Sequence, residues 1–178
     1  MQELTEVLQE ATRSIESAYF HLDIDGGDPV YRERVYCYEL YHQMRSHWPP
    51  DCPYYLNGEI DKAAHPILTA LGASHAKPDL LVHQPGYMKG NYAIIEVKPP
   101  QPALLEIRID LEKLALFVTR VGYRRAIYLH YGYGIDASLI ERVERIASLI
   151  GGLPPIELWV HANVGEGAHM VSELKGKA

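Results

Sequence analysis

KPDLLVH at residues 77–83 and NYAIIEVK at residues 91–98 are two short, mostly apolar runs, and the fold depends on them more than on any other stretch. Both runs are rich in the apolar and β-branched side chains that favour β-strands. Residues 84–91, which join the runs, include one proline and two glycines, as loops between strands often do. The sequence therefore predicts a β-hairpin whose two strands pair antiparallel.

Charged residues stand at one end of this predicted hairpin. Glu96 and Lys98 are two positions apart on the second strand, so their side chains lie on the same face of the sheet. Val97, between them, points to the opposite face and into the core. Asp79 opens the first strand directly after a proline, and antiparallel pairing brings the start of that strand to the end of the next. We therefore expect Asp79, Glu96 and Lys98 to meet at one edge of the sheet.

The rest of the chain predicts helices and further strands around this hairpin. The spacing of apolar residues indicates helices at 2–19, from about 29 to 47, at 102–121 and at 136–150, and strands at 54–61, 125–131 and 156–161. Asp28 and Pro29 are expected to begin the second helix, and Gly122 to end the third. The tail from Gly165 is expected to fray. This order of elements indicates an α/β fold, a mixed central sheet flanked by helices.

The composition is typical of one globular domain. The chain has 178 residues, 47% of them hydrophobic, and we interpret residues 1–178 as a single domain. No apolar run approaches the roughly 20 residues that a membrane-spanning helix needs, and the polar, amphipathic start is unlike a secretory signal. Cys37 and Cys52 are the only cysteines. We therefore expect a protein of the reducing cytoplasm without a membrane partner.

Two carboxylates and an amine at one site suit metal-dependent chemistry on phosphate esters. Mg²⁺ usually binds through one or two protein carboxylates and completes its shell with water and phosphate oxygens. The metal neutralises the phosphate and acidifies a water, and Lys98 would orient that water or assist its deprotonation. A Glu-x-Lys pair alone is more often an ordinary ion pair on a solvated strand. The placement of Asp79 at the start of the hairpin favours the functional interpretation.

The motif Pro78-Asp79 … Glu96-Val97-Lys98, within KPDLLVH and NYAIIEVK, resembles that of the PD-(D/E)XK nuclease superfamily, which has the restriction-endonuclease-like fold. The αβββαβ core of that family corresponds to about residues 29–131, with an extra N-terminal helix and a C-terminal αβ extension in this chain. The resemblance implies that Asp79 and Glu96 bind Mg²⁺ or Mn²⁺, aided by the Val97 carbonyl. It also implies that Lys98 activates the water and that phosphodiester bonds are hydrolysed.

Many members of that superfamily carry another glutamate on the helix before the sheet, and this chain has two candidates. Glu33 precedes an apolar stripe of the second helix, made of Tyr36, Cys37, Leu40 and Met44. A carboxylate beside a buried stripe needs a partner, which a nearby metal would supply. Glu39 lies on a different face of the helix. We favour Glu33 as the site residue, although either glutamate can instead pair with an arginine of the same helix.

Four further charged residues have two open interpretations each. Glu59 can reach the metal if its strand adjoins the strand of Asp79, or Glu59 and Asp61 can form a strand-end ion pair with Lys62. Asp110 and Lys113, on the third helix, can face either the site or the solvent.

The residues that would contact nucleic acid are less clearly marked. A net charge of −6 opposes tight, nonspecific binding, although a local basic surface can exist on an acidic protein. Arg120, Arg124 and Arg125, with Lys113, are the best candidates for such a surface, and their charges also suit a helix C-terminus. The 13 tyrosines can stack on splayed bases or cover an oligomer interface. The nine histidines show no zinc-site spacing.

These observations predict a metal-dependent nuclease that hydrolyses nucleic acid, and DNA rather than RNA. Substrate choice would come from loops, a homodimer partner or another subunit. One rival interpretation is a non-catalytic nucleic-acid-binding or scaffold subunit of the same fold. Another is a metal-dependent hydrolase of small phosphate esters. The intact set of Asp79, Glu96 and Lys98 favours the nuclease over the scaffold.

Overall fold

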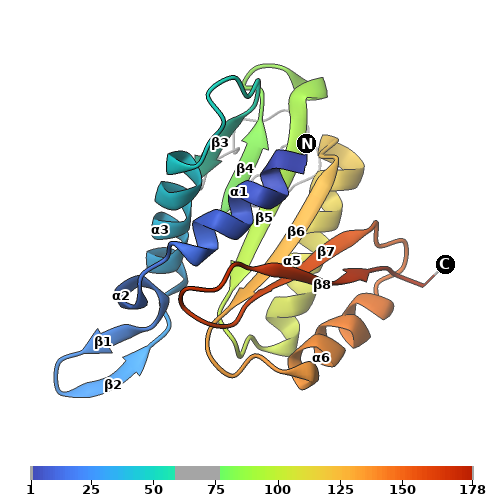
Figure 1. The fold of residues 1–178 in the computed structure, drawn as a ribbon. Coiled ribbons are helices and arrows are strands. Elements are labelled where there is room, and N and C mark those ends of the chain that lie inside the picture. The colour runs from blue at the N-terminus through green and yellow to red at the C-terminus, as the bar shows by residue number, and fades with distance from the viewer. Residues whose placement is uncertain (1, 59–76, 178) are drawn as a thin grey trace.

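The computed structural model describes residues 2–58 and 77–177. Its centre is a six-stranded mixed sheet with helices packed on both faces (Figure 1). The first pair of helices, α1 (Gln2–Arg13) and α3 (Glu33–Ser46), covers one face. The second pair, α5 (Leu104–Leu116) and α6 (Ala137–Ser148), covers the other. This arrangement confirms the expected α/β class.

The strands of the sheet follow the order β3-β4-β5-β6-β7-β8. They are β3 (Tyr55–Gly58), β4 (Leu80–His83), β5 (Asn91–Lys98), β6 (Arg125–Tyr131), β7 (Ile156–His161) and β8 (His169–Leu174). Pairing is antiparallel from β3 to β5, parallel from β5 to β7 and antiparallel again between β7 and β8. The two parallel connections run through α5 and α6, because a parallel pair needs a long crossover.

The predicted hairpin of β4 and β5 is present. Leu80 pairs with Ile95, so the residue that precedes β4 lies beside the end of β5. The connecting loop contains one short 3-10 turn, η1 (Met88–Gly90). On its other side β5 pairs with β6, where Lys98 is in register with His130. The carboxyl end of β5 therefore lies inside the sheet, between β4 and β6.

Strand β5 separates two hydrophobic cores. Ile95 and Val97 pack in the core that contains α1 and α3, whereas Ile94 packs in the core that contains α5 and α6. Because side chains alternate along a strand, Glu96 and Lys98 share the α5 side of the sheet with Ile94. The fold thus directs two charged residues toward the face of the sheet that α5 and α6 cover.

The N-terminal region differs from its prediction in two places. Residues 2–19 form two helices, because α1 ends at Arg13 and the single turn α2 (Ser17–Phe20) follows. The Ser14 hydroxyl donates to the carbonyl of Glu10 at 2.9 Å, at the end of α1.

The second helix begins at Glu33, not near Pro29, so Asp28 and Pro29 do not cap it. Residues before it form a small hairpin of β1 (Leu22–Ile24) and β2 (Gly27–Val30), which extends away from the sheet (Figure 1). Gly26 in its turn has φ +71°, a conformation that glycine adopts without strain. Asp-Gly between two extended runs is a hairpin signal, and here it overrides the helix-start signal of Asp-Pro.

The expectation of a frayed tail is wrong. Residues 169–174 form β8, which pairs with β7 through Ile156 and Leu174. Leu174 is buried in the core with α5 and α6, so apolar burial holds the tail in place. The amide of Ala168, just before β8, donates to the hydroxyl of Thr12 on α1 at 2.7 Å.

The end of the third helix is as predicted. α5 continues into the π-helical segment η2 (Phe117–Val121), and Gly122 ends it with φ +86°. Among the helices that the structure describes, none is long and apolar enough to cross a membrane.

Candidate active site

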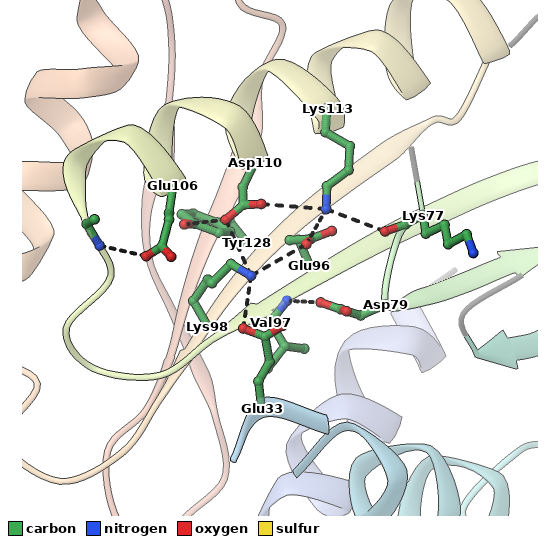
Figure 2. A network of polar contacts seen from close by, with 11 residues as sticks. Glu33, Lys77, Asp79, Glu96, Val97, Lys98, Glu106, Asp110, Lys113 and Tyr128 are labelled. Carbon is green, nitrogen blue, oxygen red and sulfur yellow. Dashed lines mark hydrogen bonds and ion pairs between the residues drawn. The ribbon is translucent and has the colours of Figure 1, made fainter. Parts of the chain in front are cut away.

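Six charged side chains converge at the carboxyl end of β5 (Figure 2). They are Glu33 from the first turn of α3, Asp79 from the residue before β4, Glu96 and Lys98 from β5, and Asp110 and Lys113 from α5. The hairpin register brings Asp79 beside Glu96, and the two-residue spacing turns both Glu96 and Lys98 toward α5. The structure thus brings Asp79, Glu96 and Lys98 together, as the sequence predicted.

Lys98 lies among three carboxylates. Its Nζ donates to Glu33 Oε2 at 2.9 Å and lies 3.7 Å from Asp110 Oδ2 and 3.9 Å from Glu96 Oε1. Burial lowers the pKa of Lys98, but the nearby carboxylates of Asp110, Glu33 and Glu96 outweigh burial and raise the pKa above its ordinary value. Lys98 is therefore held as an ammonium group whose position is fixed from three sides.

A second lysine, Lys113, reaches the same cluster from α5. Its Nζ donates to Glu96 Oε1 and lies 3.5 Å from Asp110 Oδ1. It also lies 3.5 Å from the carbonyl oxygen of Lys77. Lys113 thus occupies one oxygen of Glu96 and ties α5 to the chain just before β4.

The two carboxylates expected to bind metal are buried. Asp79 Oδ2 accepts a hydrogen bond of 2.8 Å from the backbone amide of Val97, which fixes its orientation. Burial raises the pKa of Asp79 to about 6, although the bond from Val97 opposes the rise. Burial, together with the charge of Asp79, also raises the pKa of Glu96 well above its ordinary value, while Lys113 opposes this rise.

The charges of the cluster do not balance. With all six groups ionised, four carboxylates face two ammonium groups, which leaves two negative charges in excess. Glu96 Oε2 is buried and has no hydrogen-bond partner among the described residues. A buried carboxylate oxygen without a partner is costly, and a cation would relieve that cost.

A divalent cation held by Asp79 and Glu96 fits this arrangement. Within residues 2–58 and 77–177, no group of three or more His, Cys, Asp or Glu side chains is placed to hold a metal ion. Mg²⁺ commonly uses only one or two protein carboxylates and keeps several waters, so two carboxylates suffice for it. The donor set therefore suits an oxygen-binding ion of the Mg²⁺ type and not a zinc site built from protein ligands alone.

The structure separates the two candidate glutamates of α3. Glu33 reaches the cluster through its hydrogen bond with Lys98. Glu39 instead accepts a hydrogen bond of 2.6 Å from Gln43, one turn further along the same helix. The geometry therefore places Glu33, the favoured candidate, at the site. Glu59 and Asp61 lie outside the described residues.

Asp110 and Lys113 are site residues that the sequence left open. Asp110 lies on the stripe of α5 that also contains Ile107, Leu111 and Leu114, all of them buried. The Tyr128 hydroxyl donates to Asp110 Oδ2 at 3.3 Å. A carboxylate in the middle of an apolar stripe was the available signal, the same signal that favoured Glu33.

Three residues of the predicted basic surface, Arg120, Arg124 and Arg125, lie away from this cluster, whereas the fourth, Lys113, belongs to it. Arg125 begins β6 and is in register with Ala93, whereas Lys98 is in register with His130, so the two residues lie at opposite ends of the paired strands. The Arg125 guanidinium forms an ion pair with Glu157 at 2.7 Å. Arg124 donates to the carbonyl of Lys89 at 3.2 Å, and Arg120 lies in η2 on the same side of the molecule as Arg125. A strand of seven residues separates the η2 turn from the site end of β6, so these arginines lie away from the cluster, and their role in binding nucleic acid stays a prediction.

A hollow of about 470 Å³ opens beside the cluster, on the α3 side. Its described lining consists of Glu33, Arg34, Cys37, Tyr38, Tyr41, Gly58, Asp79 and Leu80. Glu33 and Asp79 belong both to this lining and to the charged cluster. A ligand in the hollow would therefore touch the carboxylates directly.

Comparison with known proteins gives no significant match to any family model, to any curated protein or to any solved structure.

Proposed function

We propose that this protein is a divalent-metal-dependent nuclease that hydrolyses phosphodiester bonds of nucleic acid, and of DNA rather than RNA. The observation that carries the proposal is the unbalanced carboxylate cluster at the carboxyl end of β5, with Glu96 Oε2 buried and without a partner among the described residues. Such a cluster costs the fold free energy, and perturbed carboxylates gathered in this way are typical of functional sites.

Asp79 and Glu96 would hold Mg²⁺ or Mn²⁺, with the Val97 carbonyl as a further ligand by resemblance to PD-(D/E)XK nucleases. The ion supplies charge neutralisation of the phosphate and a water of lowered pKa. The amide of Val97 keeps the Asp79 carboxylate in a fixed orientation. This preorganisation means that the carboxylate need not reorient during the reaction.

Lys98 would bind the attacking water or a phosphate oxygen. Its ammonium carries three donors, and Glu33 holds it at 2.9 Å on the α3 side. Asp110 limits its movement on the α5 side, at 3.7 Å. Glu33 and Asp110 are thus positioning residues that act through Lys98, whereas Lys98 would touch the substrate.

The non-catalytic scaffold remains the second candidate, and one contact favours it. Lys113 already binds one oxygen of Glu96, so part of the carboxylate charge is neutralised within the chain. In a scaffold, Lys98 and Lys113 would be structural counter-ions, and added metal would change little.

A cleavage assay distinguishes the nuclease from the scaffold. It compares the wild type with one variant in β5 and two in α3, of which one is a control. Single-stranded and duplex DNA and RNA are incubated with Mg²⁺, Mn²⁺ or EDTA. Cleavage by the wild type should require metal, and Lys98→Ala should lower its rate by about 100-fold or more. Glu33→Gln should lower the rate about 10-fold, because the glutamine oxygen can still accept from Lys98 but no longer carries the charge that strengthens the bond.

The matched control is Glu39→Gln, a change of the same kind on the same helix at a residue bound to Gln43. It should cleave like the wild type. No metal-dependent cleavage of any of the four substrates, or equal rates for Lys98→Ala and the wild type, would refute the nuclease and favour the scaffold.

A further inference from the structure

The hollow beside Asp79 has an aromatic wall. Tyr38 and Tyr41 are three residues apart on α3, so their side chains project from neighbouring positions on one side of the helix. Tyr38 is 64% exposed, although it is a large, mostly apolar side chain. Tyr41 is only partly exposed and packs against the core that α1 and α3 share. One ring is thus open to the solvent and the other is fixed in place.

The described lining of the hollow contains one cationic side chain. Arg34 is the only Lys or Arg among its described lining residues, and Glu33 and Asp79 supply carboxylates to the same wall. The arginines at the η2 end of the sheet lie at the other end of β6, so they do not extend this surface. Duplex DNA is bound mainly through Lys and Arg that contact its two phosphate backbones, and the described lining offers one such residue.

An unpaired base fits the hollow better than a duplex does. Base faces stack on aromatic rings without regard to sequence, and stacking supplies an attraction besides that of positive charge for phosphate. Arg34, one turn before Tyr38 on α3, also lines the hollow. This mode of binding is also compatible with a net charge of −6.

From these features we infer that the hollow binds one unpaired base of a single-stranded nucleic acid by stacking on Tyr38, and that single strands are therefore the substrate of the site. The inference rests on the proposed nuclease function. Glu33 and Asp79 belong to both the hollow and the charged cluster. The phosphodiester of a nucleotide whose base occupies the hollow would therefore lie near the carboxylates that we propose bind the metal.

Binding to labelled oligonucleotides tests this inference. Thymidine and uridine oligonucleotides of roughly 10 nucleotides, within the range that single-strand sites cover, and a DNA duplex of the same length are titrated with the full chain. Fluorescence anisotropy is measured in Ca²⁺, which also prefers oxygen ligands. The wild type should bind at least one single strand more tightly than the duplex, and the DNA and RNA arms distinguish the two sugars.

Three tyrosine variants make the test specific. Tyr38→Ala should weaken single-strand binding by roughly 10-fold, whereas Tyr38→Phe, which keeps the ring, should bind like the wild type. The control is Tyr87→Ala, because Tyr87 is 55% exposed and lies in the β4–β5 loop, at the other end of β5 from Lys98. It should not change the affinity. Fluorescence of 2-aminopurine in the strand should be quenched by the wild type and less by Tyr38→Ala.

Three outcomes would overturn the inference: tighter binding to the duplex, no measurable binding to either single strand, or equal single-strand affinity of Tyr38→Ala and the wild type. The cleavage assay with Lys98→Ala reports on the nuclease separately. If Lys98→Ala abolishes metal-dependent cleavage while Tyr38→Ala leaves binding unchanged, the proposed nuclease function is supported and the inferred stacking site at Tyr38 is refuted.

Discussion

The two ends of the parallel strands β5, β6 and β7 differ in whether their partly buried carboxylates are neutralised by neighbouring residues. At the amino end, Arg125 donates to both carboxylate oxygens of Glu157 at 2.7 and 2.8 Å, and Trp159 donates to the same carboxylate at 3.0 Å. Burial acts to raise the pKa of Glu157, but the bonds from Arg125 and Trp159 outweigh burial and lower the pKa. One positive charge meets one negative charge, and both Glu157 oxygens have donors.

At the carboxyl end the same strands carry a cluster with excess negative charge. Burial raises the pKa of both Asp79 and Glu96, and Glu96 Oε2 has no partner among the described residues. The first arrangement stabilises the fold by itself, whereas the second would gain from an added cation. The difference supports the proposal that the carboxyl end binds a ligand, whereas the charges at the amino end are already paired within the fold.

The largest expected effect comes from removing one charge of the cluster. Asp79→Asn retains an oxygen that can accept from the Val97 amide and removes a metal ligand. We expect metal-dependent cleavage to fall on the order of 1,000-fold. Without metal, the free energy of unfolding should stay constant or rise by about 1 kcal/mol, because a buried carboxylate is lost. Initial rates and urea unfolding in EDTA measure the two effects, and a variant that is destabilised yet fully active would contradict the comparison.

A change of pH tests how a buried histidine at the carboxyl end of β7 affects the free energy of unfolding. His161 is buried there, its Nδ1 lies 2.7 Å from the Tyr36 hydroxyl, and burial lowers its pKa from 6.5 to about 4. Its neutral form therefore stabilises the fold above pH 6.5, and this contribution is lost as the pH falls toward 4. Relative to His161→Phe, the wild type should lose roughly 2–3 kcal/mol of unfolding free energy between pH 7.5 and pH 4. Urea unfolding of both proteins measures the difference, and parallel pH profiles would show that His161 titrates equally in both states.

The smallest expected effect is at the amino end. Glu157→Gln breaks the ion pair with Arg125, whose side chain is only 20% exposed. We expect a loss of about 2 kcal/mol in the free energy of unfolding, less than for a fully buried pair. Metal-dependent cleavage per folded molecule should not change. A loss of cleavage that exceeds the loss of folded protein would show that the two ends are coupled.

Features set by local sequence were predictable. The β4–β5 hairpin follows from two apolar runs and a loop with proline and glycine, and its register follows from the alternation of side chains. The meeting of Asp79, Glu96 and Lys98 is a direct consequence of that register. Asp136 begins α6 as predicted, with its Oδ1 accepting from the amides of Ser138 and Leu139.

Features set by contacts between distant segments were not predictable. The tail forms β8 because it pairs with β7, and six residues with weak strand character reveal nothing of that partner. The side of α5 that faces β5 decides whether Asp110 and Lys113 join the cluster, and helix rotation depends on the packing of the whole face. The distance of the arginines near β6 from the site could not be predicted for the same reason, since it depends on strand direction relative to the site.

The most direct test of the metal site is a calorimetric titration with Mn²⁺, followed by a cleavage assay on the same samples. The wild type and Glu157→Gln should bind Mn²⁺ and cleave nucleic acid, whereas Asp79→Asn should do neither. Wild-type protein that binds no Mn²⁺ and cleaves nothing, or an Asp79→Asn variant that does both, would contradict the assignment of the carboxyl end of β5 as a metal-dependent active site.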